Sequence, residues 1–139
     1  MRTINDIIIH CAATLANMDI GAAEIREWHV RERGWRDIGY HYVIRRNGVI
    51  EPGRDESIAG AHCQGRNARS IGICLAGGLG NDRRPENNFL PCQFDALERL
   101  IRELRQRYPG AGIHGHSDYA DKACPVFDVQ AFCRERGLA

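Results

Sequence analysis

The stretch Asp6-Ile7-Ile8-Ile9-His10 decides the fold of this chain. It is a short β-branched run that ends where turn-like residues begin. An apolar run without polar alternation is typical of a strand that is buried on both faces of a central sheet. The run therefore predicts a central strand, and it places His10 at the end of that strand.

A hairpin and several further strands are expected around this central strand. Asn47-Gly48 is typical of a two-residue type I′ turn, which needs positive φ angles, and it would join strands over residues 40–46 and 49–51. Other strand candidates are a buried segment over residues 70–76, a weaker one over residues 58–62 and a short one over residues 112–116. These segments supply the partners that a central strand needs.

Three amphipathic segments predict helices between and after the strands. In residues 22–33 the apolar positions recur at steps of three and four, and a glycine follows as a stop signal. Residues 91–108 show the same spacing, and Asp128 can cap a last helix over residues 129–136. Strands and helices interleave, so the sequence predicts a single α/β domain over residues 1–139, with its sheet layered by about three helices.

Composition and charge exclude several classes of protein. Hydrophobic residues make up 43% and charged residues 27% of the 139 positions, as in ordinary globular domains. The formal charge of +1 offers no electrostatic footprint for nucleic acid or for an anionic membrane. The apolar runs are far shorter than the roughly 20 residues that span a bilayer, and residues 1–6 lack the apolar core of a secretory signal. We therefore expect no nucleic-acid partner, no stable membrane association, and synthesis in the cytoplasm without a signal peptide.

Six cysteines without a C-x-x-C pair favour free thiols or metal ligands over a disulfide framework. Zinc hydrolases take three protein ligands from imidazole, thiolate and carboxylate groups and leave a fourth position for water. His116 and Cys124 could share an ion with His10 at the end of the first strand. On spacing alone, the other interpretation is a set of core histidines with satisfied hydrogen bonds and an inert thiol.

Four motifs along the chain point to a known family. They are Ile8-Ile9-His10-Cys11-Ala12-Ala13-Thr14, Gly34-Trp35-Arg36-Asp37-Ile38-Gly39-Tyr40-His41-Tyr42, Ser70-Ile71-Gly72-Ile73 and Lys122-Ala123-Cys124-Pro125. In this order, from about His10 to Phe132, they resemble the zinc-dependent N-acetylmuramoyl-L-alanine amidases of the phage amidase-type lysozyme and peptidoglycan recognition protein family. The resemblance implies a central mixed β-sheet flanked by helices, with the active cleft on one side of the sheet.

The resemblance implies Zn²⁺ as the cofactor and assigns its ligands to His10, His116 and Cys124. It assigns the catalytic roles to Tyr40 and Lys122. Non-hydrolytic recognition members of the family characteristically lack the third ligand, whereas Cys124 is present here, so the resemblance favours an active enzyme. We expect Lys122 to stabilise negative charge on the carbonyl oxygen, and Tyr40 to bond the attacking water or to carry its proton.

Other candidate residues have weaker support. His62 and Asn67 match a loop that lines the groove near the muropeptide in the family, which makes them predicted substrate contacts; a solvated turn with a locally bonded asparagine explains them equally well. His41 is expected to be structural and Trp28 to lie in the core. His114 precedes the predicted strand-end ligand by two positions, and we expect it to pack there or to orient a neighbour.

The sequence thus predicts hydrolysis of the amide bond between N-acetylmuramic acid and L-alanine in bacterial peptidoglycan. We expect a phage or prophage endolysin, a bacteriolytic enzyme that reaches the cell wall after release through a membrane lesion made by another protein. Peptidoglycan is the expected partner, and no protein partner is indicated. Two alternatives stay open: a non-catalytic muropeptide-binding or regulatory module of the same fold, and a cysteine hydrolase with Cys124 as nucleophile and His116 as base.

Overall fold

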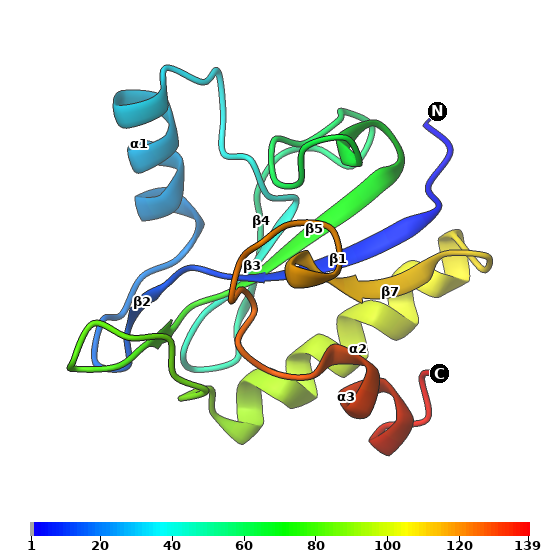
Figure 1. Cartoon of the computed structure of the whole chain (residues 1–139). Helices are drawn as coiled ribbons and strands as arrows, with labels where there is room; N and C mark the ends of the chain where they lie inside the picture. Colours follow the sequence, from blue (N-terminus) through cyan, green and yellow to red (C-terminus); the bar gives the residue numbers. More distant parts are fainter. Residues whose placement is uncertain (1) are drawn as a thin grey trace.

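The computed structural model describes residues 2–139, which form a five-stranded sheet with helices on both sides (Figure 1). The strand order is β4-β3-β5-β1-β7, with β1 (Asp6–Cys11), β3 (Tyr42–Ile44), β4 (Ile50–Pro52), β5 (Ser70–Leu75) and β7 (Gly112–Gly115). A separate parallel pair consists of β2 (Thr14–Leu15) and β6 (Gly78–Leu79). The helices are α1 (Ala22–Arg33), α2 (Pro91–Arg107) and α3 (Val129–Glu135), with short 3₁₀ helices η1 (Asn67–Arg69) and η2 (His116–Asp118).

The sheet is mixed, because β3, β5, β1 and β7 run parallel while β4 is antiparallel to β3. β1 lies between β5 and β7, with Ile8 opposite both Gly72 and His114. The side chains of Ile7, Ile8 and Ile9 are fully buried. The predicted strand with two buried faces is therefore confirmed, as is the α/β fold with a mixed sheet and three flanking helices.

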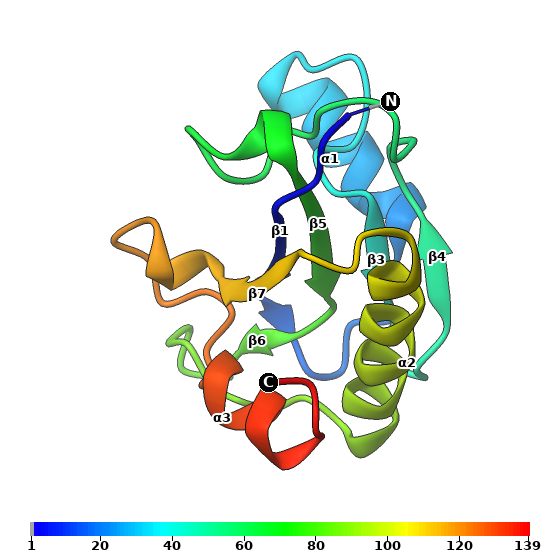
Figure 2. The same ribbon diagram turned by 90° about the vertical axis from the view of Figure 1, so that its right-hand side faces the viewer.

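The two faces of the sheet carry different helices, because side chains alternate along each strand. Ile7, Ile9 and Cys11 of β1 belong to a large core cluster that includes residues of α2 and α3. The opposite face packs on α1 through a smaller cluster that includes Cys74 of β5. Figure 1 shows α2 and α3 together below the sheet and α1 above it, and in Figure 2 α2 stands to the right of β1, β5 and β7 with α3 at the bottom. His10 follows Ile9 in the alternation, so its side chain points to the face on which α1 packs.

The start of α2 shows how the fold replaces a missing helix cap. Leu90 has no side chain that can bond the first turn, but Gln93 Oε1 accepts a hydrogen bond from the Leu90 N–H at 3.0 Å. Gln93 is fully buried, and its Nε2 donates to the Ala76 carbonyl at 2.9 Å. The helix is thereby tied to the end of β5.

Within residues 2–139, no helix is both long and apolar enough to cross a bilayer.

The β3–β4 hairpin is confirmed, but the predicted type I′ turn is wrong. Gly48 has a positive φ of 85°, whereas Asn47 keeps a negative φ, and the Gly48 N–H donates to the Arg45 carbonyl at 2.9 Å. This geometry is a type I turn followed by a left-handed glycine, which makes a longer loop. Asn47 Oδ1 accepts a hydrogen bond from the Val49 N–H at 3.0 Å, so the asparagine stabilises the turn through its side chain.

Residues 58–62 form an irregular loop with bends, and the weaker strand predicted there is wrong. Asn67 Oδ1 accepts hydrogen bonds from the N–H groups of His62 and Cys63, each at 2.9 Å. These groups bond within the loop and therefore do not join a sheet. Ile58 is 54% exposed, so it does not supply the buried position that a strand in this sheet requires.

Three strands are shorter than predicted, and the differences at β3 and β7 move site residues. β3 begins at Tyr42, so Tyr40 lies in the loop before the strand and not on its first residue. β7 ends at Gly115, whose N–H donates to Asp118 Oδ2 at 3.1 Å, and η2 begins at His116. His116 therefore departs from the strand alternation that the sequence predicted.

Candidate metal centre

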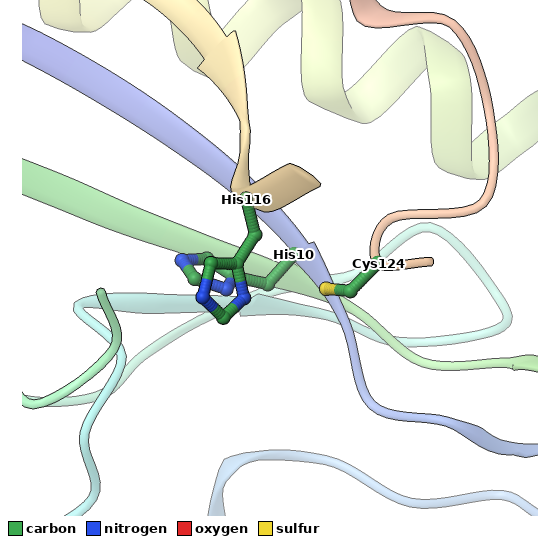
Figure 3. Close-up of side chains that lie close together, drawn as sticks. All are labelled: His10, His116 and Cys124. Carbon is green, nitrogen blue, oxygen red and sulfur yellow. The ribbon is translucent and has the colours of Figure 1, made fainter. Parts of the chain in front are cut away.

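Three side chains with metal-binding atoms converge at one edge of the sheet (Figure 3). They are His10, His116 and Cys124, and their ligand atoms all lie within 4.8 Å of one another. β1 and β7 are parallel neighbours whose carboxyl ends meet at this edge, and the two histidines directly follow the paired residues Ile9 and Gly115. Their ring centroids are 4.6 Å apart. The fold thus brings together the three residues to which the resemblance assigned the ion.

Cys124 comes from the loop after η2, and backbone hydrogen bonds hold it in place. The Cys11 N–H donates to Cys124 Sγ at 3.0 Å, so the end of β1 contacts the thiol directly. The Ser117 N–H donates to the Cys124 carbonyl at 2.9 Å and closes the loop on η2. All six cysteines are free, which leaves the Cys124 thiol available as a ligand.

Burial sets the protonation of the three side chains. It lowers the pKa of His10 well below the ordinary value, and the nearby His62 and His116 lower this pKa further. Burial and the charge of Lys122 lower the pKa of His116. Both imidazoles are therefore neutral at neutral pH and carry a lone pair. The hydrogen bond that the Cys124 thiol donates to the Cys11 side chain, followed by burial, raises the pKa of Cys124, so a bound cation has to displace the proton of this thiol.

The donor set fits zinc. Two imidazoles and one thiolate are ligands that Zn²⁺ binds in catalytic sites, with the fourth position left for water or substrate. Mg²⁺ and Ca²⁺ prefer oxygen ligands, and the converging set has none. The chemistry of His10, His116 and Cys124 therefore selects zinc over the common hard cations.

Tyr40 packs against the first of the three ligands. Its ring centroid lies 5.1 Å from that of His10 and 5.6 Å from that of His29. The backbone on either side is fixed, because the Gly39 N–H donates to His29 Nδ1 at 2.9 Å and the Arg54 N–H donates to the Tyr40 carbonyl at 2.9 Å. Burial, followed by the nearby thiols, raises the pKa of Tyr40 well above the ordinary value. The phenol therefore keeps its proton at neutral pH and can donate a hydrogen bond.

Lys122 lies exposed in the loop between η2 and Cys124. It is the only lysine in the chain. Its backbone N–H donates to the Ala120 carbonyl at 2.9 Å, which shapes this turn. The positive charge of Lys122 lowers the pKa of His116, so the ammonium group acts on the same site as the metal ligands.

His62 lies in the loop before η1 and Asn67 begins η1; both predicted substrate contacts bond to protein groups. His62 is 8% exposed, and its Nδ1 lies 2.8 Å from Nε2 of His10. Burial, followed by neighbouring positive charges, lowers the pKa of His62 to about 3. Asn67 uses its side-chain oxygen for the two loop N–H groups described above. Substrate contact by these residues stays a prediction, while the contact between the two histidines was not indicated by the sequence.

A cavity of about 500 Å³ lies beside the metal centre. Its wall begins at Ala12, which follows β1 directly, and includes Met18 and Trp28. Glu32 and Arg83 add opposite charges to a lining that is otherwise mostly apolar. Trp28 is half-buried, so the core position predicted for it is only partly right. The cavity gives the centre a concave surface on which an extended ligand can lie.

His114 lies next to the centre but outside the ligand set. Its Nε2 is 3.5 Å from Asp6 Oδ1, and its Nδ1 is 3.6 Å from Asp118 Oδ2. Asp118 also accepts the N–H that ends β7. His114 therefore supports η2, the turn that carries His116.

Comparisons with known proteins place these features in one family. Residues 1–127 match the family described as N-acetylmuramoyl-L-alanine amidase. The endolysin of Enterobacteria phage K11 is 49% identical over 130 residues, which cover 94% of this chain and 85% of that protein. The endolysin of Escherichia phage T7 is 42% identical over 132 residues, which cover 95% of this chain and 87% of that protein.

Solved structures give the same result. The N-acetylmuramoyl-L-alanine amidase LysC from Clostridium intestinale URNW matches with a TM-score of 0.82 at 30% identity, over 99% of this chain and 88% of that chain. Drosophila PGRP-LB matches with a TM-score of 0.76 at 29% identity, over 90% of this chain and 76% of that chain. The resemblance inferred from the four motifs, and the fold and enzyme class that it implied, are confirmed. On these matches, this chain belongs to the N-acetylmuramoyl-L-alanine amidase family.

Proposed function

We propose that this chain hydrolyses the amide bond between N-acetylmuramic acid and L-alanine in peptidoglycan, with a zinc ion held by His10, His116 and Cys124. The observation that carries the proposal is the convergence of two imidazoles and one thiol within 4.8 Å, next to a cavity of about 500 Å³. The endolysin relatives and the amidase structures support it. We also propose that residues 1–139 act as a single amidase domain.

The chain supplies a cation for the charge that develops during hydrolysis. When bound there, a zinc ion would supply Lewis acidity towards a carbonyl group and would make water acidic enough to ionise near pH 7. Negative charge then builds on the substrate carbonyl oxygen, and a group that binds this charge more tightly than the neutral amide accelerates the reaction. Lys122 is the proposed group, because its ammonium acts on His116 and its side chain is exposed at the rim of the site.

Tyr40 is the proposed hydrogen-bond donor of the site. In the metal-free protein, burial raises the pKa of Tyr40, so the phenol carries its proton on Oη and can donate it in a hydrogen bond. The packing of its ring on His10 keeps it beside the proposed metal position. The atom that receives this hydrogen bond is the attacking water or the substrate carbonyl oxygen.

The cavity beside the centre is the proposed site for the stem peptide. Its volume of about 500 Å³ lies within the roughly 300 to 1,000 Å³ that is usual for ligand sites. Met18 and Trp28 offer apolar contacts for alkyl side chains, and Arg83 offers a partner for a peptide carboxylate. Glu32 is suited to a free amino group.

We propose that the enzyme acts on the cell wall as an endolysin, the name that its phage relatives carry. A muropeptide-binding module without catalysis is the alternative, and a variant of Drosophila PGRP-LB is described in complex with tracheal cytotoxin. The complete set of two histidines and Cys124, together with Lys122, supports hydrolysis over binding alone.

Digestion of purified peptidoglycan, followed by mass spectrometry, tests this proposal. Released peptides with a free N-terminal L-alanine would support the amidase. New reducing sugar ends would identify a glycosidase, and binding without products would identify a recognition module. Treatment with a chelator and return of zinc separate the metal hydrolase from a cysteine hydrolase that uses Cys124, because only the metalloenzyme loses and regains activity.

A further inference from the structure

His62 contacts His10, one of the three proposed metal ligands, and its ring packs against Gly72 of β5. Its Nδ1 lies 2.8 Å from Nε2 of His10, and the two rings meet edge-on with centroids 4.9 Å apart and planes at 88°. The other ring nitrogen, Nε2, lies 3.1 Å from Ser70 Oγ. His62 is 8% exposed and Ser70 is fully buried. Both nitrogens of His62 are therefore engaged by protein groups inside the molecule.

The chain forms a slot for the His62 ring. Gly72 of β5 faces it, because a Cβ at this glycine would lie 2.6 to 2.8 Å from Cγ, Cδ2 and Nδ1 of the ring. A Cβ at Gly60 would lie 2.7 Å from Cδ2 of the same ring. Asn67 Oδ1 holds the His62 backbone N–H at 2.9 Å. Two glycines and one asparagine thus fix the orientation of the imidazole.

One proton occupies the hydrogen bond between His10 and His62, and its position decides which atom of His10 is free. If His62 donates, Nε2 of His10 accepts and the remaining proton of the neutral ring is on Nδ1, so neither nitrogen of His10 has a free lone pair. If His10 donates from Nε2, its Nδ1 has a free lone pair. In that second arrangement His62 accepts at Nδ1 and donates from Nε2 to Ser70 Oγ, which completes the chain of hydrogen bonds.

We propose that His62, supported by Ser70, is a positioning residue that holds His10 as the Nε2–H tautomer and so presents Nδ1 of His10 to the zinc ion. The inference rests on zinc binding in the proposed function, but it does not depend on the substrate. Groups that orient a metal-binding histidine in this way typically contribute about 10- to 100-fold to metal affinity. His62 thereby acts on the reaction through His10, and this role differs from the substrate contact predicted from the sequence.

Nuclear magnetic resonance of the zinc-loaded wild-type protein tests the tautomers directly. Long-range ¹H–¹⁵N spectra should show His10 protonated on Nε2 with zinc on Nδ1, and His62 protonated on Nε2. Ligation of zinc by Nε2 of His10, or a proton on Nδ1 of His62, would overturn the inference. This measurement needs no variant and therefore does not depend on how well a variant folds.

Zinc affinity of variants tests the energetic role. We expect the zinc dissociation constant, measured by competition with a chromophoric chelator, to rise about 10- to 100-fold in His62→Ala. His62→Asn, whose Oδ1 can accept in place of Nδ1, should recover most of the affinity. Ser70→Ala should show a smaller loss, because it removes the acceptor that keeps the proton on Nε2 of His62. The melting temperature of each metal-free variant reports the purely structural effect.

Zinc affinity tests the role of His62, whereas release of peptides from peptidoglycan tests the proposed function, so the two can fail independently. If the zinc dissociation constants of all variants equal that of the wild type, the inference is wrong. If affinity is unchanged while hydrolysis falls, His62 contacts the substrate instead. If His62→Ala does not fold, His62→Asn and Ser70→Ala decide the question together with the tautomer spectra. A wild-type protein that binds zinc but releases no peptides from peptidoglycan would contradict the proposed function and leave this test intact.

Discussion

The guanidinium carbon of Arg66 lies 4.2 Å from the ring centroid of Tyr119, and this contact joins the loop that carries His62 to the segment that follows η2. Arg66 belongs to the loop that carries His62, whereas Tyr119 directly follows η2 and precedes Lys122. The Tyr119 hydroxyl also lies 3.5 Å from Asp6 Oδ1. The segment that carries the proposed catalytic cation is therefore attached to the rest of the molecule partly through one exposed arginine.

Replacing Arg66 should loosen this segment without removing the metal. We expect Arg66→Ala to lower kcat a few-fold and to reduce the free energy of unfolding by less than about 1 kcal/mol, because an exposed cation–π contact contributes about 0.5 to 1 kcal/mol. Zinc content should not change. Arg69→Ala, three residues further along in η1, is the matched control and should keep the wild-type kcat. An equal loss of kcat in both variants would contradict the role given to the Arg66–Tyr119 contact.

Cys124→Ser should lower both zinc affinity and turnover, because a neutral hydroxyl is a far weaker zinc ligand than a thiolate. Metal analysis after dialysis against a weak chelator, together with the rate of peptidoglycan hydrolysis, measures the two effects. Cys92→Ser changes an exposed thiol on α2 and is the control, with wild-type zinc content expected. Full activity of the metal-free wild-type protein would refute the metal mechanism.

Lys122→Ala should keep the zinc and lose about 10² to 10³ in kcat, which is the usual effect of removing one donor that stabilises an oxyanion. Lys122→Arg keeps the charge and should retain part of the rate. Steady-state kinetics on soluble muropeptides and metal analysis provide the readouts. A parallel loss of metal and activity in Lys122→Ala would show that the side chain has a structural role.

His116 and His114 should respond differently to substitution. Zinc content should collapse in His116→Ala, because this residue belongs to the converging ligand set. It should survive in His114→Ala, because the ring nitrogens of His114 lie near Asp6 and Asp118, at 3.5 and 3.6 Å, and outside the ligand set. Both variants remove one imidazole, so each controls for the other. The reverse pattern would show that the ligand assignment is wrong.

Acid should destabilise the metal-free protein before its carboxylates titrate. The pKa of His62 falls from 6.5 to about 3 on folding. The unfolded chain takes up a proton below about pH 6.5 that the folded chain does not, so the stability from this neutral ring is complete above pH 6.5 and is lost as the pH falls towards 3. Each pH unit within this window costs about 1.4 kcal/mol for one such group.

Urea denaturation at about pH 7 and pH 5 measures this effect. The wild type should lose about 2 kcal/mol more than His62→Asn between these two values, because the variant lacks the titrating group. Metal-free samples are essential, since bound zinc would add its own pH dependence. Equal losses in the two proteins would mean that His62 does not stay neutral in the folded state.

Local patterns predicted the parts of the fold that depend on burial. The run Ile7 to Ile9 identified the central strand, because a strand covered on both faces has to be apolar at every position. The turn at Asn47 was mispredicted, because an Asn-Gly pair is compatible with more than one loop length and the pairing of Ile44 with Ile50 selected the longer one. Residues 58–62 were mispredicted because the Asn67 side chain binds the backbone N–H groups of His62 and Cys63, where the segment would have to join a sheet.

The residues of the candidate site that occur in motifs could be predicted from the sequence. Contacts that depend on how a loop packs against the sheet could not be predicted in this way. His116 and Cys124 are close enough in sequence for one motif to relate them. The contact between His10 and His62 spans 52 positions and depends on the loop that lays one ring against Gly72. Such a contact leaves no spacing signal in a single sequence. A glycine within an otherwise apolar strand, as at position 72, is the local feature that could have indicated a close approach there.

The position of the only lysine limits how this protein can be attached to other materials. Reagents that acylate amines would react at the amino terminus and at Lys122, and the arginines that supply the other basic side chains would not react. Coupling to an amine-reactive resin would therefore anchor some of the molecules through Lys122, the side chain proposed to stabilise charge during hydrolysis. In these molecules the cleft would face the support. Attachment through the exposed thiol of Cys92, on the helix that covers the opposite face of the sheet, would leave the cleft open to particulate cell walls.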